Sequence, residues 1–418
     1  MGGLFRRLFF RPLEGLRGVR LEVRYPGGTR VLGDEAASLR AELDIHDESL
    51  FSRAIFGGDV AFGRAYTEGL WTTPDLFSLA RIAIRNLEAF DMGGRLLSTA
   101  ARWTHRLGHR IRGNSIRGSR RNIAAHYDLG NALYEIFLDR HLAYSCGYYE
   151  HPDATLEEAQ EAKFERICRK LGVGPSHHLL EIGTGWGGFA IWAAARHGCR
   201  VTTTTISRAQ HDLARERIER AGLSDRVTLL FEDYRRLSGT FDRIVSIEMF
   251  EAVRLERYDE FFGAMDRLLS PEGAMLLQTI TMNEQRFPRY RKQPDWIQLD
   301  VFPGAELACL SEILRSIARV SRLSLVHLED IGAHYVRTLA AWRSRFLAAR
   351  DRVLGLGFDE RFFRLWDYYL ATCAAAFAER SIGDAQILFV KHPSSHRLWG
   401  EPAFEDPAWS PRSSAARS

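Results

Sequence analysis

The stretch Leu179-Leu180-Glu181-Ile182-Gly183-Thr184-Gly185-Trp186-Gly187-Gly188 decides the fold. An apolar strand expected over His178 to Ile182 runs into a glycine-rich turn, and a helix expected over Gly188 to His197 follows. In such a unit, glycines let backbone N–H groups approach a ligand closely. The stretch therefore predicts a nucleotide-type site at the carboxyl end of a parallel strand. A glycine turn that binds no ligand is the alternative.

Strand and helix patterns continue on both sides of this stretch. Further strands are expected at Arg200 to Thr205, Val227 to Phe231, Arg243 to Ile247, Ala274 to Ile280, Ser324 to Glu329 and Gln386 to Lys391. Helices are expected at Thr155 to Leu171, Arg208 to Ala221 and Leu255 to Leu269, the last ending at Ser270-Pro271-Glu272-Gly273. This alternation predicts an α/β fold with a Rossmann-like, seven-stranded, mostly parallel sheet, covered by helices on both faces.

The acid inside the loop, Glu181, indicates which ligand the turn binds. The dinucleotide fingerprint G-x-G-x-x-G is met at Gly183, Gly185 and Gly188, but a single match of this kind is weak evidence. A carboxylate here suits a cationic ammonium, whereas it would repel a pyrophosphate. Because E-x-G-x-G is typical of S-adenosylmethionine methyltransferases, S-adenosylmethionine (SAM) is the expected cofactor, bound by Glu181, Gly183 and Gly185.

Polar residues after the next two strands complete the expected cofactor site. No acid ends the second strand, so Thr205 and Gln210 are expected to supply the hydrogen bonds to the ribose. Asp233 is expected to bind the adenine amino group, and Tyr234 to form an apolar wall beside it. Taken alone, these four residues fit an ordinary surface loop equally well.

Composition excludes several classes of protein. The chain has 418 residues, with 57 Lys and Arg against 53 Asp and Glu, and 45% of its residues are hydrophobic, which is typical of a globular protein. The five cysteines are scattered without a CxxC pair, so we expect no disulfide framework, no zinc ribbon and no other metal site. The sequence shows neither a signal-peptide pattern nor an apolar run of about 18–20 residues, so a cytoplasmic protein is expected.

The chain is expected to divide into four parts. Residues 1–100 form a small α+β accessory domain, with a hairpin around Pro26-Gly27-Gly28 and helices at Asp47 to Phe56 and Asp75 to Phe90, separated by Gly57-Gly58 and Pro74. Residues 101–121 form an Arg-rich linker, and residues 122–393 form the cofactor-binding domain. The tail, residues 394–418, is expected to be disordered.

Positive charge is concentrated in the first part of the chain. Residues 1–121 hold 20 Arg, no Lys and 13 acids, a net charge of +7. Such a segment attracts an anionic membrane surface, although a solvated linker explains it equally well. No nucleic-acid partner is expected, because no nucleic-acid-binding motif accompanies the charge. The accessory domain is expected to contact either the membrane or a second copy of the chain in a homodimer.

Five motifs make a resemblance specific. In order they are Ala125-His126-Tyr127-Asp128-Leu129-Gly130-Asn131, Tyr144-Ser145-Cys146-Gly147-Tyr148-Tyr149, the glycine loop, Ser246-Ile247-Glu248-Met249-Phe250-Glu251 and Phe302-Pro303-Gly304. Together, over about Asn122 to Lys391, they resemble the cyclopropane-fatty-acid synthase family of SAM-dependent methyltransferases, which includes the mycolic acid cyclopropane synthases. The resemblance implies a class I methyltransferase fold and transfer of the SAM methyl group to a cis double bond of an unsaturated phospholipid acyl chain. It also implies an enzyme that acts at the inner face of an anionic membrane as a peripheral protein.

The resemblance further implies the catalytic residues. Methyl addition to an alkene leaves a carbocation, which must lose a proton before the ring closes. In relatives the base is a bound bicarbonate, and its binding set carries over to Cys146, Glu251, Tyr335 and the backbone of Ile280. Cys373 matches a cysteine to which a function is often assigned, and Tyr144 and Ser145 lie on the cofactor side. The aromatic residues expected to stabilise the cation are Tyr144, Tyr148, Phe250, Trp296, Phe302 and Tyr335.

Several of these residues also fit a structural role. Cys373 lies in an apolar helical stretch and fits a core cysteine. Trp296 and Phe302 fit the core as well as an acyl channel, and Glu248 with Glu251 fits either a surface pair or a site at a strand end.

Gln278 is a departure from the family pattern. It stands where these synthases usually carry a His that contacts bicarbonate. Gln hydrogen-bonds an anion but neither carries charge nor relays a proton. The expected product is therefore a cyclopropane or, if ring closure fails, a methyl- or methylene-branched chain. The alternatives are a small-molecule N- or C-methyltransferase and a non-catalytic SAM- or lipid-binding protein.

Overall fold

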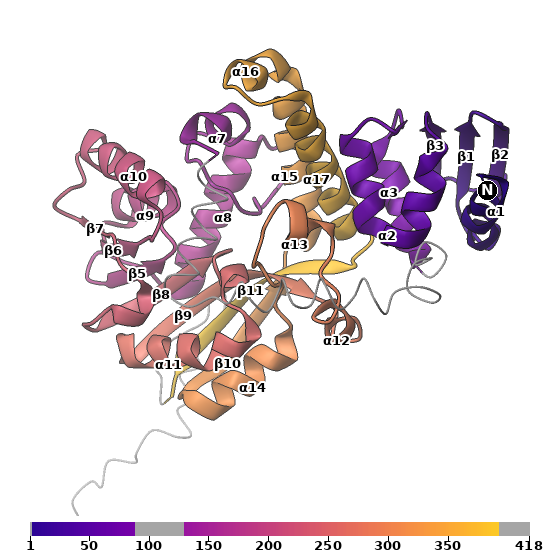
Figure 1. Ribbon diagram of the computed structural model, residues 1–418. Coiled ribbons are helices and arrows are strands. Elements are labelled where there is room, and N and C mark those ends of the chain that lie inside the picture. The colour runs from indigo at the N-terminus through magenta and orange to yellow at the C-terminus, as the bar shows by residue number, and fades with distance from the viewer. Residues whose placement is uncertain (1, 88–128, 393–418) are drawn as a thin grey trace, which may run out of the picture.

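A computed structural model describes residues 2–87 and 129–392 of the chain (Figure 1). The expected linker, residues 101–121, and the expected tail, residues 394–418, lie outside the described residues, as does most of the first of the five motifs. The described residues form two sheets, a large one that carries the cofactor loop and a small one near the N-terminus.

The large sheet has seven strands in the order β10-β11-β9-β8-β5-β6-β7. Its strands are β5 (His178–Ile182), β6 (Arg200–Thr204), β7 (Val227–Leu230), β8 (Phe241–Ile247), β9 (Leu269–Met282), β10 (Leu323–Asp330) and β11 (Ile382–Lys391). The pairings from β7 through β9 are parallel, whereas β11 runs antiparallel to both β9 and β10. The strand order reverses beside β5, between β6 and β8, which is where open α/β sheets bind their ligands.

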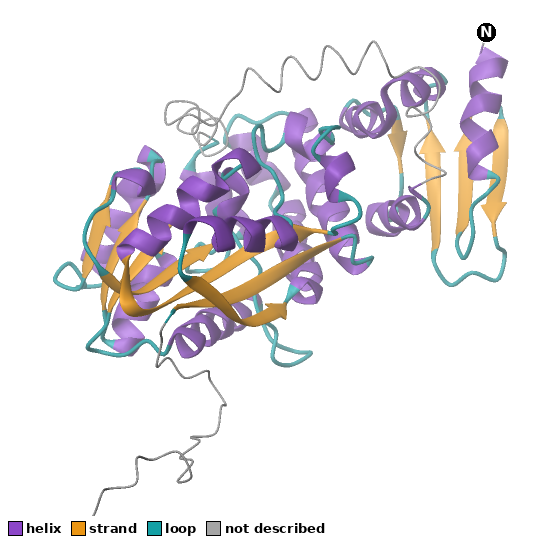
Figure 2. Ribbon diagram, turned by 90° about the horizontal axis from the view of Figure 1, so that it is seen from below, coloured by secondary structure: helices purple, strands orange, loops and turns teal. Residues whose placement is uncertain are grey.

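Helices cover both faces of this sheet (Figure 2). Leu179 and Leu180 illustrate the alternation, because they are buried in different hydrophobic clusters. One face packs against α8 (Leu156–Leu171), α9 (Gly188–His197) and α10 (Arg208–Arg220). The other packs against α11 (Tyr258–Leu268) and α14 (Leu310–Val320). The structure therefore confirms the predicted α/β class I methyltransferase architecture.

An aromatic cluster lies beyond the carboxyl ends of the parallel strands. It is built mainly from α7 (Asn131–Phe137), α15 (Gly332–Ala348) and α17 (Glu360–Ala378), with α16 (Arg350–Gly355) at one edge. The short helices α12 (Phe287–Tyr290) and α13 (Trp296–Asp300), together with three single-turn helices at Tyr234–Arg236, Phe250–Ala252 and Leu255–Arg257, complete this region. These segments enclose the space above the glycine loop.

The N-terminal part is an α+β unit. Its four-stranded sheet has the order β2-β1-β3-β4, with β1 (Arg20–Tyr25), β2 (Gly28–Gly33), β3 (Arg40–Ile45) and β4 (Trp71–Thr72). The helices are α1 (Gly2–Leu13), α2 (Ser49–Thr67) and α3 (Leu76–Arg85). Strands β1 and β2 form the predicted hairpin.

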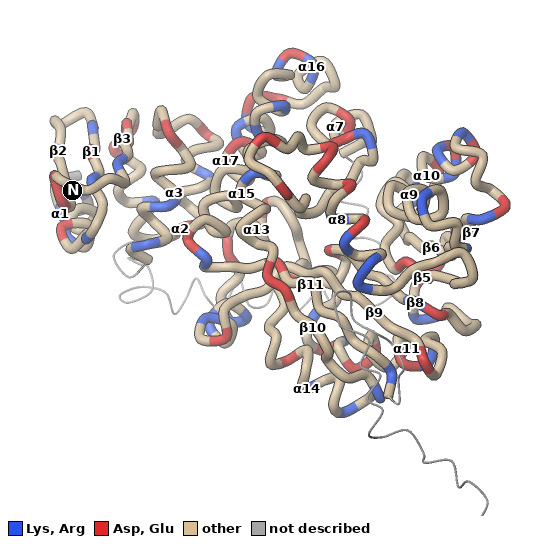
Figure 3. The backbone as a smooth tube through the Cα atoms, turned by 180° about the vertical axis from the view of Figure 1, so that it is seen from behind, with Lys and Arg blue, Asp and Glu red and all other residues tan. Residues whose placement is uncertain are grey.

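Helices α2 and α3 pack against α17, and polar bonds join the two parts. The Tyr66 hydroxyl donates to Asp367 at 2.8 Å, Arg64 forms a bidentate ion pair with Asp300 at 2.9 and 3.0 Å, and Arg81 and Arg85 both pair with Glu379. Figure 3 shows acidic and basic segments interspersed in both parts.

The predicted elements agree with the structure except at a few boundaries. All seven strands are confirmed, and α8 begins with the predicted capping box of Thr155 and Glu158. The predicted break at Gly57-Gly58 is present as a kink, because Gly58 has a non-helical conformation (φ +58°), but the helical stretch that follows it to Thr67 was not predicted. The helix expected to end at Ser270 to Gly273 ends at Leu268, and those four residues lie within β9. Helix α1 was not predicted, although Phe9, Phe10 and Leu13 bury its apolar face.

Two kinds of feature are absent from the described residues. No helix in these ranges has the length and apolar character that a membrane span requires. No cluster of three or more His, Cys, Asp or Glu side chains in the same ranges could hold a metal ion.

Candidate active site

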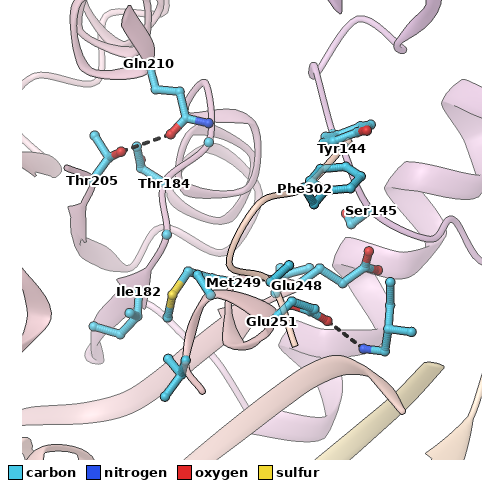
Figure 4. Close-up of a pocket in the computed structure, with 18 of the residues that line it drawn as sticks. Tyr144, Ser145, Ile182, Thr184, Thr205, Gln210, Glu248, Met249, Glu251 and Phe302 are labelled. Carbon is cyan, nitrogen blue, oxygen red and sulfur yellow. Dashed lines mark hydrogen bonds between the residues drawn. The ribbon is translucent and has the colours of Figure 1, made fainter. Parts of the chain in front are cut away.

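A cavity of about 350 Å³ lies at the carboxyl ends of β5, β6 and β8. Figure 4 shows Thr184, Thr205 and Gln210 on one side of it and Tyr144, Ser145 and Phe302 on the other, with Glu248, Met249 and Glu251 between them. The cavity therefore has a cofactor end, formed by the glycine loop and the segments after β6 and β7. It also has a carboxylate end, formed by Glu248 and Glu251 after β8.

The glycine loop has the backbone geometry that the sequence predicts. Gly183 and Gly185 adopt φ angles of +97° and +50°, which disfavour any residue with a side chain. A Cβ atom on Gly183 would lie 2.9 Å from the Met249 side chain, and one on Gly188 would lie 2.3 Å from the carbonyl oxygen of His141. The backbone therefore passes close to its neighbours and leaves the space above it for a ligand.

Unused polar atoms at the cofactor end fit SAM. The Thr184 hydroxyl is buried and has no hydrogen-bond partner among the described residues. The Thr205 hydroxyl donates to the side-chain oxygen Oε1 of Gln210 at 2.9 Å. This leaves the side-chain N–H groups of Gln210 to face the cavity that both residues line. Such donors and acceptors suit the ribose and amino-acid groups of SAM.

Glu181 lies at the base of this end with 2% of its surface exposed. Its carboxylate accepts a hydrogen bond from the Thr203 hydroxyl at 2.5 Å. Burial raises the pKa of Glu181 to about 7, so the carboxyl group changes charge near neutral pH. A cationic ammonium in the cavity would favour the ionised form, which agrees with the predicted role of Glu181 toward SAM.

Asp233 and Tyr234 also line the cavity. Both oxygens of Asp233 are held by Arg235, at 2.8 and 2.6 Å, so this carboxylate is already paired with a cation. Tyr234 packs edge-to-face on Phe261, with ring centroids 5.3 Å apart, and burial raises its pKa. The ring of Tyr234 therefore lines the cavity, and its role beside the adenine stays a prediction. An adenine amino group would share Asp233 with Arg235.

Three donors converge on Glu248 at the carboxylate end. The Tyr335 hydroxyl donates to Oε2 at 2.5 Å, and the backbone N–H of Cys146 and the side-chain amide of Gln278 both donate to Oε1 at 2.8 Å. Burial raises the pKa of Glu248, and these three hydrogen bonds oppose that shift. Glu248 does not belong to the catalytic set predicted from the sequence.

Glu251 lies one turn further along the chain. Its Oε1 accepts from the backbone N–H of Ile280 at 2.6 Å and from the Thr279 hydroxyl at 2.9 Å. Its Oε2 is buried and has no hydrogen-bond partner within the part of the chain that the structure describes. Burial, followed by the nearby Glu248, raises the pKa of Glu251 to about 7. The Ile280 backbone N–H, which was expected to bind a bicarbonate, therefore donates to Glu251 in this structure.

The other predicted catalytic residues divide between cavity and core. Ile280, Tyr335 and Cys373 line the cavity, whereas Cys146 and Gln278 do not. The Cys146 thiol contacts the carbonyl oxygens of Gly147 and Ile331, and burial raises its pKa well above the ordinary value, so it is no nucleophile here. Burial also raises the pKa of Cys373, which keeps that thiol protonated.

Three of the six aromatic residues expected near a cation line the cavity: Tyr144, Phe302 and Tyr335. The other three do not. Phe250 is buried against α11, Tyr148 stacks under Arg166 at 4.4 Å, and Trp296 packs edge-to-face on Tyr368 at 4.8 Å. Tyr144 reaches Tyr369, with its hydroxyl 3.0 Å from that of Tyr369, so Tyr369 is a further wall residue that the sequence analysis missed.

Ser145 connects the cavity to a buried cation. Its hydroxyl accepts a hydrogen bond from the ammonium of Lys163 at 2.6 Å, and its carbonyl oxygen accepts from Gln160 at 2.8 Å. Lys163 is fully buried, and desolvation lowers its pKa. Lys163 therefore fixes the loop that carries Tyr144 and Cys146 while adding positive potential near Glu248.

Known proteins resemble the chain in sequence over most of its length. A family model described as mycolic acid cyclopropane synthetase matches residues 114–387. The chain is 36% identical over 370 residues to tuberculostearic acid methyltransferase UfaA1 of Mycobacterium tuberculosis, covering 85% of this chain and 84% of that protein. It is 38% identical over 362 residues to the cyclopropane-fatty-acyl-phospholipid synthase of Escherichia coli K12, covering 84% and 88%.

Solved structures share the fold. The mycolic acid cyclopropane synthase CmaA1 complexed with SAH and CTAB matches with a TM-score of 0.61 and 29% identity, over 65% of this chain and 98% of that chain. Coclaurine N-methyltransferase, bound to N-methylheliamine and SAH, matches with a TM-score of 0.59 but only 20% identity, which shows the fold alone. The glycine loop, the buried acid beneath it and these matches together establish that the chain belongs to the mycolic acid cyclopropane synthetase family and is an SAM-dependent methyltransferase.

Proposed function

We propose that this enzyme methylates the cis double bond of unsaturated phospholipid acyl chains, giving a cyclopropane or a methyl- or methylene-branched product. One observation carries the proposal: the cofactor end and the carboxylate end belong to a single cavity. Beside the carboxylates, the wall is apolar and aromatic, formed by Ile297, Phe302, Tyr369, Phe377 and Ile382. An acyl chain suits this lining, because it would bury its methylenes there with its double bond near the carboxylates.

The residues of this wall fit the charge that the reaction develops. When bound, SAM supplies an electrophilic methyl group on a sulfonium. The faces of Phe302, Tyr335 and Tyr369 would each stabilise a carbocation on the acyl chain by about 0.5–2 kcal/mol in a site without water. Tyr335 is held in place by stacking on Phe377, with ring centroids 4.5 Å apart. The carboxylates after β8 add negative potential and a proton acceptor.

The names of the relatives support the same substrate class. One relative is a tuberculostearic acid methyltransferase and another a cyclopropane-fatty-acyl-phospholipid synthase, so both names refer to fatty acyl products. One name describes a methyltransferase and the other a cyclopropane synthase, and Gln278 raises the same two alternatives, a branch or a ring.

A phospholipid substrate requires work at a membrane surface. The net charge of +7 over residues 1–121 supports peripheral binding to anionic lipid. Neutralising Arg117, Arg120 and Arg121, which lie outside the described residues, is expected to weaken co-sedimentation with anionic liposomes, most strongly at low salt. Unchanged co-sedimentation would contradict this part of the proposal.

Isotope labelling tests the proposed reaction. The chain would be expressed in a host without its own cyclopropane synthase, fed methyl-deuterated methionine, and the fatty acids analysed by mass spectrometry. A ring or a methylene branch retains all but one of the methyl deuteriums, whereas a saturated methyl branch can retain all of them. If no lipid gains label while the purified protein still binds SAM, the acyl chain is not the substrate. Small amines would then be the next substrates to test.

A further inference from the structure

Glu248 has a backbone conformation that a side chain rarely adopts. Its φ is +46°, in the left-handed region that favours glycine, and only three non-glycine residues among those described have a positive φ. The conformation costs about 1–3 kcal/mol and persists where the surroundings fix it. Here the Glu248 N–H donates to the Gln278 carbonyl oxygen at 2.8 Å, which holds the strained turn against β9.

The strained turn places the Glu248 carboxylate where three hydrogen-bond donors converge, a position that suits an anion. Tyr335, the Cys146 backbone and Gln278 come from three distant segments, and each gives it one hydrogen bond. A carboxylate has about four lone-pair sites, so the three donors favour its ionised form, against the burial that raises its pKa, without exhausting those sites. Figure 4 shows the side chains of Glu248 and Glu251 extending the same way from the loop after β8.

Other titratable groups surround this position. Asp384 on β11 shares the Gln278 amide, which donates to it at 3.0 Å, and burial raises the pKa of Asp384 well above its usual range. Lys163 on α8 lies close enough to lower the pKa of Glu248, and Glu251 is itself affected by the charge on Glu248. A second anion added here would face at least two carboxyl groups.

Cys146 and Tyr335 were expected to hold a bicarbonate, but their donors already bind a carboxylate of the chain itself. We propose that Glu248 is the proton acceptor of the reaction and takes the position that a diffusible anionic base would need. This inference rests on the proposed function and deepens it. The role of Glu248 also explains why Gln278 stands where a His was expected, because an amide beside a carboxylate needs only to donate hydrogen bonds. Gln278 gives one N–H to Glu248 and the other to Asp384.

The proposed step balances in atoms and charge. The π electrons of the alkene form a bond to the methyl carbon, the methyl–sulfur bond breaks with its electron pair going to sulfur, and the neighbouring carbon becomes a cation. Glu248 then takes a proton from the added methyl group, and the C–H electron pair closes the ring. If a hydride first shifts to the cationic carbon, the same proton loss leaves a methylene branch. Glu248 becomes a neutral acid and returns its proton to water when the product leaves.

Two variants test this role. Glu248→Gln keeps the shape but removes the base, and Glu248→Gly removes the side chain at a φ that glycine adopts without strain. Each would be assayed in CO2-free buffer with SAM and vesicles of unsaturated phospholipid, with and without added bicarbonate or formate. SAM affinity would be measured by calorimetry. Gly263→Ala, on α11 with open space around the new Cβ, is the control for effects of substitution and purification that do not depend on the site.

We expect the wild-type rate to be independent of bicarbonate. Glu248→Gln should lose about 100-fold or more in kcat, because general-base catalysis contributes roughly 10²–10⁴-fold, with SAM affinity unchanged. Glu248→Gly should be equally slow and should regain activity with bicarbonate or formate. A wild type that needs bicarbonate, or a Glu248→Gln variant within about threefold of it, would overturn the proposal. Losses of SAM affinity that match the losses of activity would also overturn it, since Glu248 would then be a support of the cofactor site.

A binding measurement separates failure of this inference from failure of the proposed function. If the wild-type enzyme transfers no labelled methyl group to any acyl chain, the proposed substrate is refuted. NMR titration with ¹³C-bicarbonate needs no lipid, and it should show saturable binding to Glu248→Gly but none to wild type. Binding to wild type, or to neither protein, would overturn the assignment of this position to the Glu248 carboxylate.

Discussion

The two ends of the cavity are built in different ways. At the cofactor end, the continuous stretch Glu181 to Gly188 supplies a buried acid and a run of backbone. At the carboxylate end, the groups around Glu248 come from the loop after α7, from α15 and from β9, which lie far apart in the sequence. The first end depends on backbone shape, whereas the second depends on hydrogen bonds from separate segments that converge on a buried carboxyl group.

This difference separates recognition from chemistry. The backbone turn suits a cofactor that the whole fold class shares, since it needs only glycines and a strand end. A buried carboxylate with three donors is a specific arrangement, and loss of one partner leaves a costly unpaired charge. Changes at the cofactor end should therefore alter SAM affinity, and changes at the carboxylate end should alter turnover.

Gly183→Ala should have the largest effect on the cofactor end. The new Cβ would meet the Met249 side chain at 2.9 Å and would force alanine to a φ of +97°. Strain of about 1–3 kcal/mol, added to this clash, predicts a loss of about 100-fold in SAM affinity. Calorimetric titration with SAM measures it, and Gly263→Ala is the matched glycine substitution. An affinity within about threefold of wild type would show that the loop tolerates a side chain.

Tyr335→Phe should have the next largest effect, at the opposite end. It removes the hydroxyl that donates to Glu248 at 2.5 Å, and a hydrogen bond to a charged group contributes about 1.5–3 kcal/mol. We expect kcat to fall about 20-fold while SAM affinity stays unchanged. Tyr258→Phe is the control, because the buried Tyr258 hydroxyl has no hydrogen-bond partner among the described residues. A reduced SAM affinity in Tyr335→Phe would break the separation of the two ends.

The sequence predicts the cofactor end far better than the carboxylate end. Gly183, Gly185, Thr205 and Gln210 follow directly from strand ends in local sequence, and the structure places all of them on the cavity. Local periodicity also located all seven strands of the large sheet. Parallel strands with helices between them bring their carboxyl ends to one edge, so local patterns suffice there.

The carboxylate end depends on contacts that no local pattern contains. Only the packing of distant segments makes Cys146 contribute its backbone N–H while its thiol faces the core. The same packing brings Gln278 to Glu248. One signal was present in the sequence: Glu248 ends a strand in the same motif as Glu251, while Gln278 lacks the expected charge. Considered as a pair, Glu248 and Gln278 would have indicated that a side chain of the protein replaces the bound bicarbonate as the base.

Glu181→Gln should sharpen the comparison through pH. Because burial raises the pKa of Glu181 to about 7, the carboxyl group is mostly neutral at pH 6 and mostly charged at pH 8. The charged form attracts the SAM ammonium, so wild-type affinity should rise with pH, by about tenfold between those values. Calorimetry across this range should give a flatter profile for Glu181→Gln. An unchanged profile would assign the titration to another group, of which Glu251, with a pKa of about 7, is the first to test.

Arg64→Ala should have the smallest effect and shows which end the N-terminal part touches. Arg64 on α2 pairs with Asp300 on α13, and the same helix supplies the cavity residue Ile297. Exposed ion pairs contribute about 0–1 kcal/mol, so the free energy of unfolding should fall by no more than about that amount. Arg53→Ala, which breaks an ion pair with Glu68 inside the N-terminal part, is the matched control in urea unfolding. If α2 positions α13, only Arg64→Ala should raise the KM for lipid, by about twofold, with SAM affinity unchanged in both. A change in SAM affinity would mean that the N-terminal part acts on the cofactor end, and the two ends of the cavity would then be coupled.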